Sequence, residues 1–257
     1  MTRPTMVPDF HARLRSTDFL LGTWVTLLDP VAAELLAGAG FDFLIIDGEH
    51  GPLDTAHLVA TAIATRAAGV PVLARVGANE PVRIMHALDS GASGVVVPQI
   101  RTVADAERAV AWCRYPPVGL RGIAPRRASE YGRRTADYLA AANELVTCCI
   151  QVETREALGD LDAILSVPGV DALLVGPNDL SAALGHTGGL THPEVEEAVA
   201  LILDRAAVHG VPAGIWTPTT TVTRARRAQG FRFTTVGADY GFMLAAADAA
   251  VREVAAG

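Results

Sequence analysis

Eight short runs of apolar residues recur along this chain and constrain its fold more than any other feature. The segments between them carry helix signals. Asp29-Pro30, for example, combines a preferred N-cap with a residue suited to the first helical position. Alternating strands and helices build a parallel sheet, and a (β/α)8 barrel typically takes about 250 residues. The chain of 257 residues therefore predicts one α/β domain, a (β/α)8 TIM barrel over residues 1–257, with strands at 19–28, 43–46, 71–75, 94–98, 145–152, 171–175, 211–216 and 233–236.

A doubly wound open sheet is the alternative arrangement of the same elements. Dinucleotide-binding sheets of that kind carry a Gly-x-Gly-x-x-Gly turn after the first strand, and none follows residues 19–28. The longest irregular segment, 115–135, is rich in arginine. Loops of that length in compact domains are usually functional or disordered.

The apolar run at 43–46 ends in a cluster of polar residues, Asp47, Glu49 and His50. Ligand sites in α/β folds lie beyond the carboxyl ends of parallel strands, so we expect chemistry here. The other interpretation is a solvated turn with incidental charges. A lone histidine is more often structural, but an Asp47 carboxylate that fixes the imidazole tautomer could make His50 an oriented acid or base.

Polar residues also follow other predicted strands: Arg75, Gln151, Glu153 and Asp179. Two carboxylates from neighbouring strands suit a hard divalent cation such as Mg²⁺ or Mn²⁺. Glu153 could instead cap a helix that begins near residue 154, and Asp179 could complement a helix N-terminus. Arg75 could form a structural ion pair, or it could face the oxyanion that develops when a carbonyl substrate enolises.

The composition excludes several classes of function. All 21 basic residues are arginine, so Schiff-base catalysis, which needs a lysine amine, is excluded. A net charge of −7 without a concentrated basic face argues against a nucleic-acid partner. No apolar run approaches the ~20 residues of a membrane span, and no signal peptide is evident, so we expect a cytoplasmic protein. Three cysteines without a Cys-x-x-Cys pair argue against a disulfide framework or a zinc cage.

Four motifs in order give the chain a specific resemblance. It resembles the HpcH/HpaI family of class II, metal-dependent pyruvate aldolases, of the 4-hydroxy-2-oxoheptanedioate and 2-dehydro-3-deoxyglucarate aldolase type. The resemblance implies a barrel of the phosphoenolpyruvate/pyruvate-binding type and an enzyme that cleaves or forms 4-hydroxy-2-oxo acids from pyruvate and an aldehyde, through an enolate that the metal stabilises. The motifs are IDGEH (46–50), PPVGLRG (116–122), QVETREA (151–157) and VGPNDLS (175–181).

The resemblance also assigns a metal and substrate site. It implies that Glu153 and Asp179 bind the divalent ion, Mg²⁺ or Mn²⁺ with Co²⁺ as a further candidate, and that pyruvate chelates this ion. The backbone amides of Asn178 and Asp179 would hold the pyruvate carboxylate at a helix N-terminus. The pyruvate-binding residues implied in this way are Gln151, Gly176, Pro177 and Asn178.

Further roles follow from the same resemblance. Arg75 would stabilise the enolate, and His50, paired with Asp47, would act as acid or base on the aldol hydroxyl. Glu49 would position water at the metal. The family assembles as hexamers, so we expect a homo-oligomer in which the C-terminal helix packs on a neighbouring subunit and Asp89 is contributed to a neighbour's site.

Two departures from the family pattern fall where the aldehyde would lie. Arg126 and Arg127 follow Gly122 in place of a run of small residues, and Trp216 ends the seventh predicted strand where relatives often carry a smaller aliphatic residue. Our hypothesis is that Trp216 reshapes the aldehyde pocket and that one of the arginines reaches an acidic acceptor. The alternative is that the arginines are solvated and the tryptophan packs.

Rival functions keep the barrel and change the reaction. The nearest is an oxaloacetate decarboxylase, or a biosynthetic condensing enzyme, that uses the same pyruvate-enolate site. A lyase acting on acyl-CoA esters would need an adenine-binding surface, which the sequence does not reveal. A barrel without catalysis, serving as a binding module, is disfavoured because every expected site position holds a competent residue.

Overall fold

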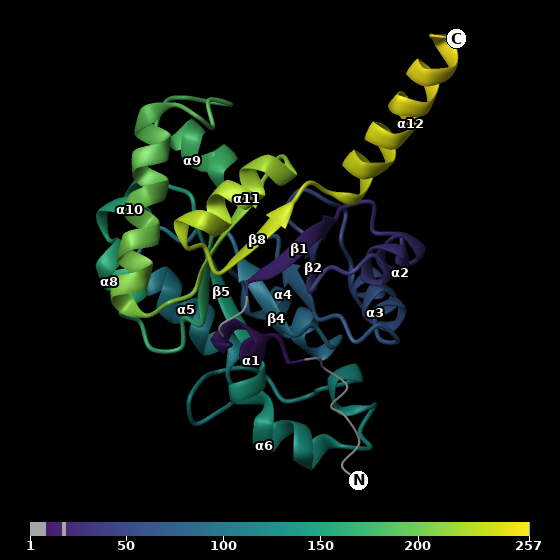
Figure 1. Ribbon diagram of the computed structural model, residues 1–257. Helices are drawn as coiled ribbons and strands as arrows, with labels where there is room; N and C mark the ends of the chain where they lie inside the picture. The colour runs from purple at the N-terminus through teal and green to yellow at the C-terminus, as the bar shows by residue number, and fades with distance from the viewer. Residues whose placement is uncertain (1–8, 17–18, 257) are drawn as a thin grey trace.

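The computed structural model describes residues 9–16 and 19–256 and confirms the predicted barrel. Each strand pairs in parallel with the next, and β8 pairs with β1, so the sheet is closed and the open-sheet alternative is wrong. Figure 1 shows the strands surrounded by helices. The strands are β1 (Leu20–Val25), β2 (Phe43–Asp47), β3 (Val72–Arg75), β4 (Gly94–Val97), β5 (Thr147–Val152), β6 (Ala172–Val175), β7 (Ala213–Thr217) and β8 (Phe233–Val236).

Helices follow the strands in the predicted alternation. The N-cap of α2 is Asp29, whose carboxylate accepts from the backbone N–H of Val31 at 2.7 Å, and Pro30 takes the first position as expected. The helices are α1 (Phe10–Arg15), α2 (Pro30–Gly38), α3 (Thr55–Ala64), α4 (Pro81–Asp89), α5 (Val103–Cys113), α6 (Thr135–Leu145), α7 (Arg155–Gly159), α8 (Leu161–Leu165), α9 (Pro177–Ala183), α10 (Pro193–His209), α11 (Thr220–Gln229) and α12 (Asp239–Ala255).

Two layers of apolar side chains hold the barrel together. The larger layer lies between the strands and the surrounding helices and is dominated by valine, leucine, isoleucine and alanine. The smaller layer fills the barrel interior, where Phe10 of α1 packs on the rings of Phe43 and Phe233 at centroid distances of 5.0 and 6.2 Å. Because these rings fill the amino-terminal part of the barrel, only the carboxyl ends of the strands remain available for a site.

The segment predicted to be irregular, 115–135, contains one 3₁₀ turn, η1 (Arg127–Ser129), and is ordered by buried contacts. Arg121 pairs with Asp89 at 2.6 Å and lies 4.4 Å from the centroid of the Tyr115 ring. The helix α6, which follows, was not predicted. Part of the segment therefore packs against the barrel, whereas Val118, Leu120 and Ile123 are exposed.

The C-terminal helix α12 extends away from the barrel (Figure 1). Several of its apolar side chains are exposed, among them Met243, Leu244, Val251 and Val254. Of the helices in the described ranges, none has both the length and the apolar character needed to cross a bilayer.

Candidate active site

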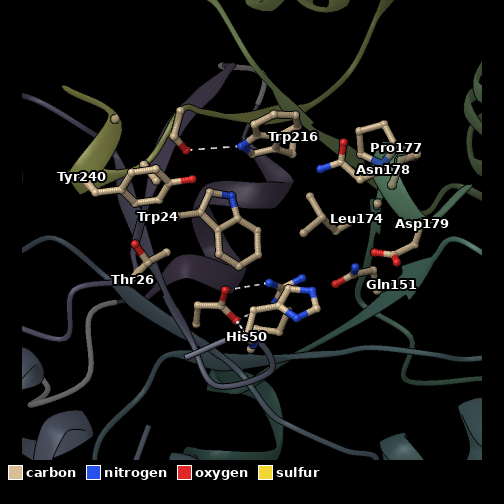
Figure 2. A pocket seen from close by; sticks show the side chains of 17 residues that line it. Trp24, Thr26, His50, Gln151, Leu174, Pro177, Asn178, Asp179, Trp216 and Tyr240 are labelled. Atoms are coloured by element: carbon tan, nitrogen blue, oxygen red, sulfur yellow. Dashed lines mark hydrogen bonds and ion pairs between the residues drawn. The ribbon is translucent and has the colours of Figure 1, made fainter. Parts of the chain in front are cut away.

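A cleft of about 530 Å³ lies at the carboxyl ends of the strands, where the sequence placed the chemistry. Figure 2 shows its walls, which come from β1, β2, β3, β5, β6, β7 and the first turns of α9 and α12. Nine of the fourteen predicted site residues line it, because parallel strands present their last residues to one face. Two more, Glu49 and Glu153, contact the lining residues Arg75 and Gln151. The lining residues include Trp24, Asp47, His50, Arg75, Gln151, Gly176, Pro177, Asn178, Asp179, Trp216 and Tyr240.

Arg75 is held in a fixed position by two carboxylates. Asp47 and Arg75 are register partners on β2 and β3, and the guanidinium donates to both Asp47 oxygens, from Nε at 3.0 Å and from Nη2 at 2.7 Å. Its Nη1 lies 3.1 Å from Oε2 of Glu49. A bidentate pair of this kind restricts the cation geometrically as well as energetically. The guanidinium therefore faces the cleft as a preorganised positive charge.

The ionisation of the two carboxyl groups differs. Burial acts to raise the pKa of Asp47, but the hydrogen bonds and charge of Arg75, with two backbone N–H donors, hold it below its ordinary value. Burial raises the pKa of Glu49, and the charge of Arg75 only partly offsets this effect. Asp47 is thus the permanent anion that anchors Arg75.

His50 lines the cleft and is exposed, but its predicted partner is wrong. Asp47 Oδ1 accepts from the backbone N–H of Glu49 at 3.0 Å and from that of His50 at 3.2 Å. Within the described ranges no hydrogen bond joins the Asp47 carboxylate to the His50 imidazole, because Arg75 and the backbone take its oxygens. Asp47 therefore orients Arg75 and the turn after β2, whereas the acid–base role of His50 stays a prediction.

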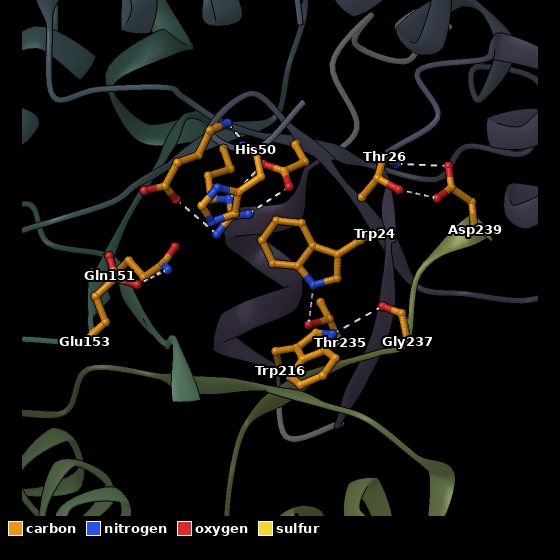
Figure 3. Close-up of polar contacts among 12 residues, drawn as sticks. Trp24, Thr26, His50, Gln151, Glu153, Trp216, Thr235, Gly237 and Asp239 are labelled. Atoms are coloured by element: carbon orange, nitrogen blue, oxygen red, sulfur yellow. Dashed lines mark hydrogen bonds and ion pairs between the residues drawn. The ribbon is translucent and has the colours of Figure 1, made fainter. Parts of the chain in front are cut away.

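Trp24 was not predicted as a site residue, and it supports Arg75 from the barrel side. Its ring centroid lies 4.5 Å from the guanidinium carbon, within the range of a cation–π contact. The indole Nε1–H donates to Thr235 Oγ1 at 2.8 Å, which fixes the ring (Figure 3). No motif surrounds Trp24 in the sequence, and the only signal was its position near the end of the first apolar run.

Glu153 is completely buried and is surrounded by amide donors. Its Oε1 accepts from the backbone N–H of Gln99 at 2.9 Å and from the Gln99 side chain at 3.1 Å, and its Oε2 accepts from Nε2 of Gln151. Burial raises the pKa of Glu153 to about 7 despite these donors, and the charges of Glu49 and Asp179 add to the rise. Such a carboxylate stays ionised at neutral pH more readily with a cation beside it.

The residues around Glu153 fit a divalent cation. Asp179 lies in the first turn of α9 and lines the cleft, and its charge raises the pKa of Glu153. Gln151 Oε1 is buried and, within the described part of the chain, has no hydrogen-bond partner. At Gly176 a Cβ would lie 2.4 Å from Oε2 of Glu153 and 2.7 Å from Nε2 of Gln151, so any other residue would displace both groups. An all-oxygen donor set with a free acceptor suits Mg²⁺ or Mn²⁺.

Asp239 forms a clamp that brings the first turn of α12 to the cleft. Its carboxylate accepts from the N–H and the hydroxyl of Thr26, at 2.9 and 2.6 Å, and from the N–H of Leu27 at 2.9 Å (Figure 3). Tyr240, in this turn, and Trp216, on β7, lie on one side of the cleft (Figure 2), and the Trp216 indole donates to Gly237 O at 3.3 Å. Trp216 therefore lines the cleft as predicted.

Three predicted residues lie outside the cleft of their own chain. Asp89, Arg126 and Arg127 line a second cleft of about 320 Å³. Arg127 is buried and donates to the carbonyls of Ala62 at 2.7 Å and Ser90 at 3.4 Å, so it fastens η1 to the barrel helices. Arg126 is exposed, and within one chain neither arginine lines the cleft that holds Trp216, so the acidic acceptor stays a hypothesis. Asp89 was expected to serve a neighbouring subunit, and that expectation stays a prediction.

The match to a known family agrees with this geometry. The family model described as HpcH/HpaI aldolase/citrate lyase matches residues 20–246. The chain belongs to this family. The match spans all eight strands and every cleft-lining residue.

Individual members of the HpcH/HpaI family are similar over nearly the whole chain. The 5-keto-4-deoxy-D-glucarate aldolase of Shigella dysenteriae serotype 1 (strain Sd197) is 40% identical over 233 residues, which are 90% of this chain and 91% of that protein. A family member from Burkholderia cenocepacia J2315 is 41% identical with a TM-score of 0.92, covering 96% of this chain and 99% of that one. The HpcH/HpaI aldolase of Desulfitobacterium hafniense DCB-2 is 26% identical with a TM-score of 0.91, and the match covers 96% of this chain and 97% of that one.

These likenesses confirm three predictions made from the sequence. The family is the expected one, the fold is the expected barrel, and the chain is an enzyme of the aldolase type that makes or breaks carbon–carbon bonds. The alternatives of a decarboxylase or a condensing enzyme are not favoured by relatives of this kind.

Proposed function

We propose that this chain cleaves or forms 4-hydroxy-2-oxo acids, with pyruvate as one partner and an aldehyde as the other. The observation that carries the proposal is that Arg75 and Asp179 line one cleft, with Glu153 buried beside the cleft residue Gln151, in a chain without lysine. A preorganised cation, together with a divalent ion held by a pair of acidic residues, can stabilise an enolate without a covalent amine intermediate.

Glu153 and Asp179 would hold a divalent ion, Mg²⁺ or Mn²⁺, with Gln151 contacting the substrate beside it. When bound, the ion supplies Lewis-acid stabilisation of the negative charge that develops on a carbonyl oxygen. Gly176 supports this role because it leaves the Glu153 carboxylate and the Gln151 amide room to lie side by side. The first turn of α9, with Asn178, would bind the pyruvate carboxylate.

In the cleavage direction, a base removes the proton of the 4-hydroxyl group. The bond between carbons 3 and 4 then breaks, the aldehyde leaves, and the electron pair passes to the 2-oxo group to give the enolate of pyruvate. Arg75 stabilises this enolate oxygen, because Asp47, Glu49 and Trp24 hold the guanidinium in place before the charge develops. A proton delivered to carbon 3 completes pyruvate.

His50 would exchange the proton with the 4-hydroxyl group. It lines the cleft and is exposed, so the proton can pass to solvent. Glu49, whose pKa is raised by burial, lies beside Arg75 and would position water. The aldehyde portion would lie against Trp216 and Tyr240, which line the side of the cleft across from His50 (Figure 2).

We also propose a homo-oligomer, a hexamer by family resemblance. The exposed apolar side chains of α12 support a helix that packs on a neighbouring subunit. Asp89, buried beside Arg121 and lining the second cleft, would then serve the neighbour's site. Light scattering on the purified protein measures the subunit count, and a monomer at all concentrations would refute the assembly.

The decisive experiment measures pyruvate release from 4-hydroxy-2-oxo acids, with and without a chelator, followed by addition of Mg²⁺, Mn²⁺ or Co²⁺. We expect release to stop on chelation and to return with metal. The variant Glu153→Gln should stay inactive with every metal, whereas Glu156→Gln, an exposed neighbour on α7, should behave as wild type. Turnover of oxaloacetate with no release from any hydroxy-oxo acid would replace the proposal with a decarboxylase.

A further inference from the structure

The loop that joins α9 to α10, residues 184–192, brings two histidines and a glutamate together outside the active-site cleft. It lies at the upper end of α10 in Figure 1. His186 and His192 stack with their ring centroids 3.4 Å apart and their planes inclined by 18°. Glu194 follows in the first turn of α10. One ligand atom from each of the three side chains lies within 4.8 Å of the other two.

Both histidines direct a ring nitrogen towards the same residue. His186 Nε2 lies 2.8 Å from Oε2 of Glu194, and the side chain of His192 accepts the Glu194 backbone N–H at Nδ1 over 3.3 Å. The lone pair of His192 Nδ1 therefore already faces the Glu194 side of the ring pair. The hydrogen bond from the Glu194 backbone N–H to this nitrogen is long, so replacing it by a bond to an ion would cost little free energy.

Backbone hydrogen bonds hold the loop in this shape. The N–H of His186 donates to Ser181 O at 2.7 Å, Gly189 donates to His186 O at 2.7 Å, and His192 donates to Gly189 O at 2.9 Å. A Cβ at Gly189 would lie 2.9 Å from the carbonyl oxygen of His186, so glycine allows the tight turn that brings the rings together. The backbone of the loop thus holds the two histidines next to each other.

We propose that His186, His192 and Glu194 form a second metal site, selective for a borderline transition-metal ion such as Zn²⁺ or Cu²⁺. Two imidazoles and one carboxylate form a donor set that such ions prefer, whereas Mg²⁺ prefers oxygen ligands. Zn–N distances of about 2.0–2.1 Å in a tetrahedral site place two ligand nitrogens roughly 3.4 Å apart, and one imidazole would turn about its χ2 angle so that both in-plane lone pairs meet at the ion. Water would complete the coordination.

The proton balance of binding follows from the hydrogen bonds. A neutral His186 that donates from Nε2 to Glu194 carries its proton on Nδ1 instead once Nε2 binds the ion, and Nε2 and the carboxylate oxygen both become ligands. His192 binds through Nδ1 and keeps its proton on Nε2. Both imidazoles therefore bind as neutral ligands, and no oxidation state changes.

The site is connected to the active-site cleft through Ser181. Its carbonyl accepts from His186, and its hydroxyl donates to the carbonyl of Asn178 at 2.7 Å, in the cleft-lining turn of α9. An ion at the loop would fasten the loop to the start of α10. Its expected consequence is stabilisation of the segment that supports α9, independently of whether the proposed aldolase function is correct.

The test counts Zn²⁺ ions bound per chain by equilibrium dialysis of the untagged protein in excess Mg²⁺. We expect His186→Gln and His192→Asn to bind one ion fewer than wild type. Asparagine is a good N-cap, so the second variant keeps α10 capped while it removes the imidazole. His209→Gln is the matched control, because His209 also pairs with one carboxylate, Asp162 at 2.8 Å, but has no second histidine beside it.

A spectroscopic measurement distinguishes this site from an all-oxygen site. Cu²⁺ bound to wild type should show nitrogen hyperfine coupling in its electron paramagnetic resonance spectrum, and both loop variants should lose it while His209→Gln keeps it. Pyruvate release with Mg²⁺ should remain at the wild-type level in all three. Equal Zn²⁺ counts in wild type and both loop variants, or unchanged nitrogen coupling, would overturn the proposal and leave a simple His186–Glu194 ion pair.

Discussion

Replacing Glu153 by glutamine probes the energetic cost of the buried carboxyl group in the metal-free protein. Burial raises the pKa of Glu153 from 4.5 to about 7, and the amide donors of Gln99 and Gln151 oppose the rise without cancelling it. Glutamine has nearly the same shape and carries no charge. Gln151 can rotate its amide so that its unpartnered Oε1 accepts from the new Nε2–H.

The direction of the pH effect follows from the two pKa values. The unfolded chain releases the Glu153 proton near pH 4.5, whereas the folded protein keeps it up to about pH 7. The folded state therefore binds more protons in this window, and the free energy of unfolding falls as the pH rises through it. The full difference corresponds to about 3 kcal/mol, and between pH 5 and pH 8 roughly 2–3 kcal/mol is lost.

The assay is thermal unfolding in the presence of chelator, with wild type and variant at equal protein concentration. Glu153→Gln should unfold about 5–10 °C higher than wild type at pH 8 and within about 3 °C of it at pH 5. Glu156→Gln removes an exposed charge from the same segment and should leave the difference unchanged. Saturating Mg²⁺ should stabilise wild type only. An offset between wild type and Glu153→Gln that does not vary with pH would refute the reasoning.

Three further predictions concern the cleft. Arg75→Lys loses the bidentate bond to Asp47 and should lower kcat for pyruvate release by about 10²–10³-fold; an unchanged kcat would exclude Arg75 from enolate stabilisation. Gly176→Ala should weaken Mg²⁺ binding at least about tenfold in a calorimetric titration, because the added Cβ displaces the Glu153 carboxylate. Gly159→Ala is the control, since a Cβ there has no atom within 4 Å, and equal Mg²⁺ affinities of the two variants would refute the argument from close approach at Gly176. Trp216→Leu should widen the range of aldehydes accepted in the synthesis direction, and an unchanged acceptor profile would show that the indole only packs.

Local sequence signals located most of the cleft but assigned one partner incorrectly. Asp47 was paired with His50 because the two are three residues apart, whereas the register of β2 and β3 places Asp47 beside Arg75, 28 residues away. Gln99 was missed because a single amide after β4 has no distinguishing neighbour. Its role depends on Glu153, which lies 54 residues further along the chain.

The arginines of the 115–135 segment show the same limit. Polar residues in a long irregular region are expected to face solvent, yet Arg121 and Arg127 are buried because acidic or carbonyl groups on α3 and α4 meet them. No local sequence pattern indicates these partners of Arg121 and Arg127, since they lie on helices that come next to the segment only in the folded barrel.

The sequence by itself determined the alternation of buried strands and helices, the family, and the polar residues that end or follow several of the strands. These properties are local, because burial on both faces of a strand and the switch to polar residues at its end are written in consecutive positions. Only the tertiary structure decided which polar atoms meet: Asp47 with Arg75, Glu153 with Gln99 and Gln151, and Asp239 with Thr26. Those contacts depend on strand register and on the closure of β8 against β1, which join residues far apart in the chain.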